Sequence, residues 1–206
     1  SGCSRSMPIE TDAPVAVIVL AAGASVRMGA PKLLLSLDGE TLLERAVGRA
    51  VAAGAEQVVV VVPRDAADMR ALLAPLRVTV VEPREDSTAM SASLHAGIGA
   101  LMPQVTAVVI VLADMIDVST VMLREVVRAA RQPGAPLVVS RYGSIQAPPL
   151  AVPRRYFAEV LAMHGEGVGK AIVARHQDEA SWLDWPPGDH RDVDTPDDYR
   201  AIRTAP

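Results

Sequence analysis

Val15-Ala16-Val17-Ile18-Val19-Leu20 is a run of six aliphatic residues with no polar residue among them. A strand that is covered on both faces has this composition, whereas a strand with one solvent-facing side alternates between apolar and polar residues. We therefore predict a buried strand here. The same pattern returns at four further places: Val58–Val62, Val78–Val81, Val108–Leu112 and Leu137–Val139.

Segments with apolar residues at helical spacing lie between these runs. Alternation of buried strands with helices favours an α/β fold, in which a parallel sheet carries helices on both faces and right-handed crossovers join its strands. Gly54, Pro75 and Pro133-Gly134 follow three of the segments, as expected where helices end. The predicted helical segments are Leu42–Val51, Met69–Leu73, Met90–Ile98 and Val121–Val127.

The pattern changes after Arg141, where Pro148, Pro149 and Pro153 flank a short apolar piece. Prolines are rare in central parallel strands, so we expect an edge or antiparallel strand near Leu150–Val152. Two further helices are predicted at about residues 154–163 and at residues 168–176. A short terminal helix is predicted to begin at Thr195, an N-cap residue followed by proline and two acids.

Length and composition exclude several classes of protein. The 206 residues carry a net charge of −4, which argues against holding nucleic acid or an anionic membrane by bulk electrostatics. The single cysteine excludes an intramolecular disulfide framework, and no apolar run approaches the ~20 residues of a membrane span. We expect a cytoplasmic protein with one domain over residues 9–206, and interpret residues 1–8 as a tag remnant without fixed structure.

The loop after the first strand has the residues needed to hold a polyphosphate. Residues 20–32 read L-A-A-G-A-S-V-R-M-G-A-P-K, with small residues that let backbone N–H groups approach an anion and with two cations, Arg27 and Lys32. Ligands of open α/β sheets bind at this edge. The spacing matches neither a P-loop nor a dinucleotide fingerprint. The alternative is a surface loop whose cations are merely solvated. A loop that points away from every cavity, or whose guanidinium and amine are both bound by neighbouring acids, would contradict the polyphosphate role.

Carboxylates near this loop are candidate magnesium ligands. Asp114 follows the run Val108–Leu112, where a carboxylate is poorly placed for packing but well placed for Mg²⁺. The alternative role, a helix N-cap, suits Ser119 or Thr120 better. Asp192 and Asp194 lie on one face of an extended segment, although Asp194 could instead cap or orient the terminal helix.

The loop resembles the signature L-A-[AG]-G-x-S-x-R-M-G-x-x-K of the molybdenum-cofactor cytidylyl- and guanylyltransferases, which have a nucleotide-diphospho-sugar-transferase fold. Leu112-Ala113-Asp114-Met115, Asp192-Val193-Asp194-Thr195-Pro196 and Met90-Ser91-Ala92-Ser93-Leu94 resemble further motifs of that family. The resemblance implies a three-layer, Rossmann-like fold with a mostly parallel sheet and an antiparallel strand in the C-terminal half.

The resemblance also implies roles for individual residues. Leu20, Ala21, Ala22 and Gly23 bind the nucleotide, and Ser91 contacts ribose or base, unless it caps its helix. Lys32 contacts the α-phosphate region, Arg27 contacts the β- and γ-phosphates, and Asp114 holds Mg²⁺, so that these three are the catalytic residues. By analogy with sugar-activating cytidylyltransferases, Asp194 is the second metal ligand. His95, in the same helix as Ser91, has the ordinary structural role of a partly buried histidine.

The implied reaction transfers NMP from a nucleoside triphosphate to a phosphorylated acceptor, molybdopterin, with release of pyrophosphate. Ala22 favours CTP over GTP. Gln146–Leu150 and Gly165–Gly169 depart from the family's acceptor-side motifs. Two alternatives therefore stay open: transfer to another phosphorylated metabolite, such as a sugar phosphate or cofactor precursor, and a non-catalytic maturation protein that binds nucleotide or cofactor for a molybdoenzyme. Two of the 20 basic residues are lysines, Lys32 and Lys170.

Overall fold

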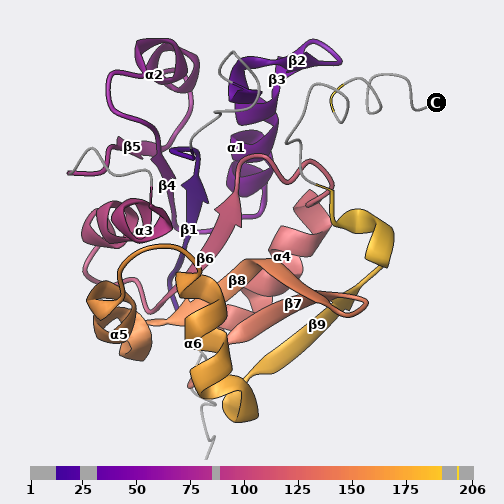
Figure 1. Ribbon diagram of the computed structural model, residues 1–206. Helices are drawn as coiled ribbons and strands as arrows, with labels where there is room; N and C mark the ends of the chain where they lie inside the picture. The colour runs from indigo at the N-terminus through magenta and orange to yellow at the C-terminus, as the bar shows by residue number, and fades with distance from the viewer. Residues whose placement is uncertain (1–12, 24–31, 85–88, 192–198, 200–206) are drawn as a thin grey trace, which may run out of the picture.

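The computed structural model describes residues 13–23, 32–84, 89–191 and 199. A seven-stranded sheet runs through it in the order β5-β4-β1-β6-β8-β7-β9 (Figure 1). β1 (Val15–Leu20) pairs in parallel with β4 (Gln57–Val61) and β6 (Ala107–Leu112), and β5 (Thr79–Val81) extends the parallel part beyond β4. The runs predicted at Val15–Leu20, Val58–Val62 and Val108–Leu112 are therefore confirmed as buried, neighbouring parallel strands. The run at Val78–Val81 also forms a strand, but the prediction that it is buried is wrong, because β5 lies at the edge of the sheet.

One strand runs against the others. β8 (Ile145–Pro153) lies between β6 and β7 (Val138–Tyr142) and is antiparallel to both, whereas β9 (Ser181–Trp185) is parallel to β7. The predicted antiparallel strand is confirmed, but the alternative of an edge position is wrong, because β9 forms that edge. Pro148 and Pro149 are tolerated in β8 because they lie opposite the irregularity in the pairing of β7 with β8, between Val139 and Arg141.

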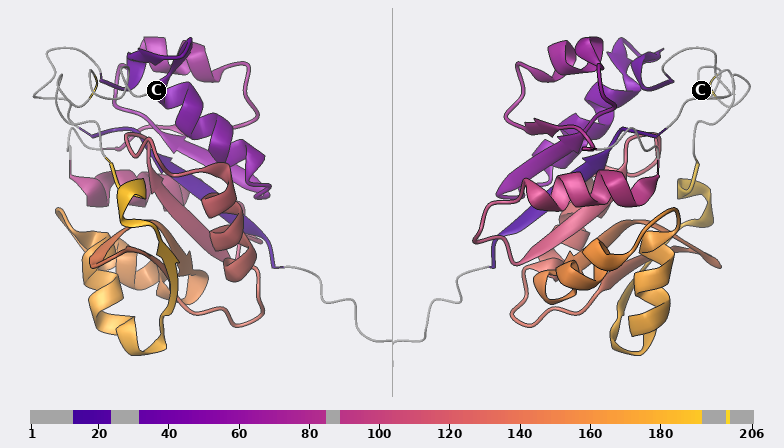
Figure 2. Two further views of the ribbon diagram at one scale, coloured as in Figure 1. Left: turned by 90° about the vertical axis from the view of Figure 1, so that its right-hand side faces the viewer. Right: turned by 60° about the vertical axis from the view of Figure 1, so that its left-hand side comes forward.

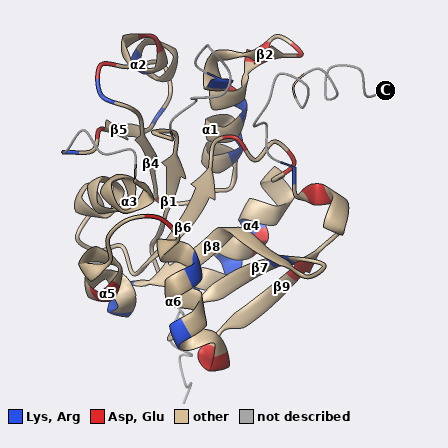
Figure 3. Cartoon of the chain, in the orientation of Figure 1, with Lys and Arg blue, Asp and Glu red and all other residues tan. Residues whose placement is uncertain are grey.

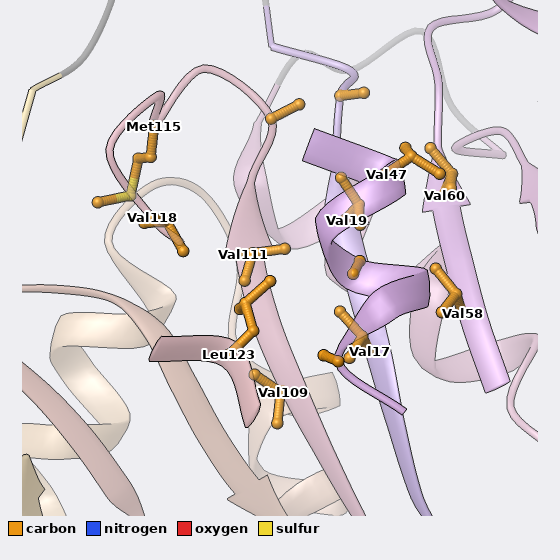
Figure 4. Packing of buried hydrophobic residues seen from close by; sticks show 14 of the residues in the cluster. Val17, Val19, Val47, Val58, Val60, Val109, Val111, Met115, Val118 and Leu123 are labelled. Atoms are coloured by element: carbon orange, nitrogen blue, oxygen red, sulfur yellow. The ribbon is translucent and has the colours of Figure 1, made fainter. Parts of the chain in front are cut away.

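Helices cover both faces of the sheet, so the fold has three layers (Figure 2). The first hydrophobic cluster joins one face to α1 (Leu42–Ala52), α2 (Ala67–Leu73) and α4 (Thr120–Ala130). Figure 4 shows part of this cluster, in which Val17 and Val19 of β1 pack beside Val47 of α1. The second cluster joins the other face to α3 (Met90–Gly99), α5 (Phe157–Ala162) and α6 (Val168–His176).

Several short elements were not predicted. β2 (Ser36–Leu37) and β3 (Glu40–Thr41) form a small hairpin before α1. At the start of α1, Thr41 and Glu44 form a capping box. The helix predicted at residues 154–163 is divided into the 3-10 turn η2 (Arg154–Tyr156) and α5. The terminal helix predicted from Thr195 lies outside the described residues. The other 3-10 turns are η1 (Lys32–Leu34), η3 (Gln177–Glu179) and η4 (Pro187–Asp189).

Gly97 sets how closely α3 packs on the sheet. A Cβ atom at Gly97 would lie 2.9 Å from Cγ2 and 3.0 Å from Cδ1 of Ile18, which is fully buried in β1. We expect Gly97→Ala to lower the free energy of unfolding by about 1–3 kcal/mol through overpacking, measured by urea denaturation. Gly99→Ala is the matched control, because nothing lies within 4 Å of a Cβ there. Equal stability of the two variants would contradict this packing argument.

Candidate active site

A cavity of about 200 Å³ lies where β1 and β6 end. Leu20 and Leu112 are register partners in these parallel strands, so the segments that follow them meet at one edge of the sheet. We name this space the β1–β6 cavity. It is lined by Leu20, Ala21, Gly23, Lys32, Leu33, Met90, Ser93, Leu112, Asp114 and Glu166.

Lys32 and Asp114 form an ion pair in this cavity. Nζ of Lys32 lies 2.6 Å from Oδ2 of Asp114, although the two residues are 82 positions apart in sequence. Their side chains are 12% and 23% exposed, so a ligand can reach both. If Asp114 had only a structural role, its ion pair would keep the Lys32 amine from binding a phosphate. Asp114, however, is the predicted metal ligand. The pair therefore places a candidate phosphate-binding cation and a candidate metal ligand within reach of one substrate.

Packing and hydrogen bonds fix the segments on either side of this pair. Leu33, next to Lys32 in η1, is buried in the first cluster. On the other side, the guanidinium of Arg49 donates to the backbone carbonyls of Ile116 and Val118 at 2.5 and 3.0 Å, which holds the loop that follows Asp114. The N-cap of α4 is Ser119, whose hydroxyl accepts from the N–H of Met122. The alternative in which Asp114 caps this helix is therefore excluded.

Three predicted residues, Arg27, Asp192 and Asp194, lie outside the described residues. Arg191, directly before Asp192, donates two hydrogen bonds of 2.6 and 2.8 Å to the carboxylate of Asp117. These bonds raise the pKa of Arg191 above its usual value. The chain is thus tied, one residue before the predicted acidic motif, to the loop that carries Asp114.

The helix α3 presents a different serine from the one predicted. The hydroxyl of Ser91 accepts a hydrogen bond from the N–H of Gly165 at 2.9 Å, and Ser93 lines the β1–β6 cavity instead. The N-cap of α3 is Ala89, so the alternative of Ser91 as a capping residue is wrong. His95 contacts the carbonyl of Met163 through Nε2 at 3.1 Å, in keeping with a structural role.

The four predicted nucleotide-binding residues of the first loop occupy different positions. Leu20, Ala21 and Gly23 line the β1–β6 cavity, whereas Ala22 is buried against the second cluster. Glu166 also lines the cavity and was not predicted; its carboxylate accepts from the N–H of Met90 at 3.3 Å. Its signal in the sequence is an acid at the second position of the altered Gly165–Gly169 segment.

A divalent cation fits the oxygen ligands of the cavity. Mg²⁺ binds one or two carboxylates and completes its shell with water and phosphate oxygens. Asp114 and Glu166 supply carboxylates in this one cavity. The described residues contain no cluster of three or more histidine, cysteine or acidic side chains that could hold a metal. This donor set suits a metal that arrives with a phosphate ligand.

A second cavity, of about 370 Å³, adjoins the first, since Met90 and Leu112 line both. We name it the β8–α6 cavity after the two elements that supply most of its lining. Its remaining lining comes from Met115, Val139, Ile145, Gln146, Ala147, Pro148, Leu150, Gly167, Gly169, Lys170, Val173 and His190. Gln146–Leu150 and Gly165–Gly169, the two segments that depart from the family motifs, thus both contribute to the walls of the β8–α6 cavity.

Comparison with known proteins identifies the class to which this fold and site belong. A family model described as the MobA-like NTP transferase domain matches residues 17–180. The chain therefore belongs to the MobA-like NTP transferase family. Among the described residues, no helix has the length and apolarity that a membrane span requires.

Three similar proteins extend this result. The crystal structure of Rv0371c from Mycobacterium tuberculosis H37Rv superposes with a TM-score of 0.83 at 29% identity, covering 95% of this chain and 100% of that one. A manganese complex of Rv0371c has a TM-score of 0.78 at 28% identity, covering 94% and 100%. A 2-C-methyl-D-erythritol 4-phosphate cytidylyltransferase of Rhodococcus opacus (strain B4) is 40% identical over 88 residues, which are 41% of this chain and 38% of the relative.

Proposed function

We propose that the protein is a magnesium-dependent cytidylyltransferase that moves CMP from CTP to the phosphate of molybdopterin. The observation that carries this proposal is the meeting of Lys32 and Asp114 in the β1–β6 cavity, at the edge of the sheet where α/β enzymes bind nucleotides. The similarity to a protein solved with manganese supports the metal. Ala22 and the similarity to a cytidylyltransferase support CTP over GTP.

The proposed reaction is an in-line displacement at the α-phosphorus of CTP. An oxygen of the acceptor phosphate forms the new bond to phosphorus, the bond from the α-phosphorus to the bridging oxygen of the β-phosphate breaks, and pyrophosphate leaves with that electron pair. The acceptor phosphate is ionised at neutral pH, so the reaction needs no general base. Catalysis then rests on positioning and on neutralisation of charge.

Each part of the site has a role in this proposal. Backbone N–H groups of Ala22 and Gly23 hold the triphosphate, since the N–H of Ala21 donates to the carbonyl of Val61. Arg27 binds the β- and γ-phosphates, and Lys32 binds the α-phosphate. Asp114 and Asp194 hold Mg²⁺, which supplies neutralisation of the phosphate oxygens when bound. Lys32 must exchange its bond with Asp114 for one with the nucleotide. The base and ribose face Ser93 rather than Ser91, since Ser93 lines the cavity.

A second candidate is transfer of CMP to a sugar or polyol phosphate. The 88-residue similarity to a 2-C-methyl-D-erythritol 4-phosphate cytidylyltransferase favours this alternative. The match spans 38% of that relative's length. The two candidates share the nucleotide reaction and differ in the acceptor.

Thermal melting with a panel of nucleoside triphosphates tests the shared part. With Mg²⁺ present, CTP at 100 times its dissociation constant is expected to stabilise the folded protein by about 2.7 kcal/mol. GTP, ATP and UTP are expected to stabilise it less at the same concentration. Chelation of the metal should remove most of the CTP effect, because Asp114 then binds Lys32 rather than the metal. A melting temperature that no nucleotide raises would refute the proposed function.

A further inference from the structure

Glu166 is the one acidic residue in the loop that joins α5 to α6, residues 163–167, where Figure 3 shows a position in red. Its side chain lines the β1–β6 cavity. The residues on either side of it, Gly165 and Gly167, have φ angles of 86° and 76°. Glycine adopts such left-handed angles readily, whereas other residues seldom do. The backbone of the loop is therefore bent on both sides of Glu166.

Three hydrogen bonds attach this loop to the start of α3. The N–H of Ser91 donates to the carbonyl of Gly165 at 3.2 Å, and the hydroxyl of Ser91 accepts from the N–H of Gly165 at 2.9 Å. The N–H of Met90 donates to Oε1 of Glu166 at 3.3 Å. Ser91 is buried, so water competes little for the first two bonds. The side chain of Glu166 is exposed, yet its carboxylate is held at the start of α3.

The carboxylate of Glu166 needs a partner other than phosphate. It shares the β1–β6 cavity with Lys32, the proposed ligand of the α-phosphate, and a carboxylate repels phosphate oxygens. Among the described residues, no basic side chain pairs with Glu166. The part of a nucleotide next to the α-phosphate is the ribose, whose 2′- and 3′-hydroxyl groups are neutral hydrogen-bond donors. A cavity of about 200 Å³ is smaller than the ~300–1,000 Å³ of sites for whole small molecules, and so suits this part of the nucleotide.

We propose that Glu166 accepts hydrogen bonds from the ribose hydroxyl groups of the nucleotide, and that it thereby selects ribonucleotides over nucleotides that lack these groups. This inference rests on the proposed function, because it assigns a residue to the nucleotide of the same reaction. Hydrogen bonds to a carboxylate are stronger than those between neutral groups. A nucleotide without ribose hydroxyls would leave the carboxylate unpaired beside the phosphates, so it loses the hydrogen bonds and also meets the repulsion.

Isothermal titration calorimetry of the full chain with two nucleotides tests this proposal. With Mg²⁺ present, CTP is expected to bind at least about tenfold more tightly than 2′,3′-dideoxy-CTP, which lacks both hydroxyl groups. Glu166→Gln keeps an oxygen for the N–H of Met90 but loses the charge. This variant should bind CTP at least about threefold more weakly than the unaltered protein. It should bind 2′,3′-dideoxy-CTP at least as tightly, because repulsion of the phosphates is removed.

Controls separate this role of Glu166 from others. Glu125→Gln removes a carboxylate that pairs with Arg128 on α4 and lines neither cavity, so both affinities should be unchanged. Equal weakening of both nucleotides in Glu166→Gln would indicate a structural role and overturn the proposal. A lower affinity of this variant for Mn²⁺ without nucleotide would also overturn it, because Glu166 would then be a metal ligand. Binding of CTP without preference over 2′,3′-dideoxy-CTP overturns this inference alone, whereas no binding of CTP overturns the proposed function as well.

Discussion

Replacement of Lys32 by alanine is expected to lower the turnover number for CMP transfer by about 10²–10³-fold. In the proposed reaction, the Lys32 amine neutralises charge that develops on the α-phosphate, and its position in the β1–β6 cavity is held by the buried Leu33. Its loss therefore removes a preorganised donor. The measurement is pyrophosphate release at saturating CTP, Mg²⁺ and acceptor.

Two controls separate this effect from a general loss of structure. Arg128→Ala removes a cation that is 70% exposed and pairs with Glu125 on α4, so its turnover should match that of the unaltered protein. Lys32→Ala should also bind Mn²⁺ severalfold more tightly without nucleotide, because the amine no longer occupies Oδ2 of Asp114. Electron paramagnetic resonance of Mn²⁺ measures that affinity. Unchanged turnover in Lys32→Ala would refute its assigned role.

Replacement of Asp114 by alanine is expected to abolish detectable Mn²⁺ binding and to lower turnover by at least about 10²-fold. The carboxylate follows β6 in the cavity that Lys32 also lines, where it would hold a divalent cation that neutralises phosphate charge. Stability should fall by at most about 1 kcal/mol, because both side chains of the ion pair retain some exposure. Titration with Mn²⁺ and pyrophosphate release measure the two effects.

Asp184→Asn is the control for this second prediction. It removes a carboxylate that pairs with Arg141 between β7 and β9, and Asp184 lines neither of the two cavities. Its Mn²⁺ affinity and turnover should equal those of the unaltered protein. If Asp114→Ala still binds Mn²⁺, other residues hold the metal, and the assignment of Asp114 is contradicted.

The core of the fold was predictable because its signal is local. β1, β4 and β6 are continuous aliphatic runs, which report burial on both faces without any knowledge of their neighbours. β9 has no such run: Ser181–Trp185 is nowhere fully buried, and it pairs only with β7 among the described strands. The order of strands also depends on tertiary pairing, which is why the interior position of β8 could not be read from its prolines.

The candidate site was predictable where its residues follow buried strands. Lys32 and Asp114 belong to loops after β1 and β6, and parallel neighbours bring such loops together. Ser91 and Ser93 differ by two positions on α3, which turns their side chains by about 200° around the helix. The motif resemblance pointed to Ser91, whereas Ser93 is the serine that lines the cavity. Glu166 lies just before α6, in the altered Gly165–Gly169 segment, and its place in the cavity depends on how that segment packs near β1 and β6, which the sequence pattern did not reveal.

The reversed direction of β8 gives the two halves of the site different origins. The parallel strands end at the edge of the sheet where the two cavities lie, whereas the antiparallel β8 begins there. Ile145–Pro148 and Leu112 therefore line the same cavity. In the proposed reaction, the acceptor would therefore meet walls from the β7–β8 hairpin and α6, while the groups that bind phosphate come from loops elsewhere in the chain. Exchange of that hairpin offers a route to retarget the protein to new acceptors with its nucleotide chemistry intact.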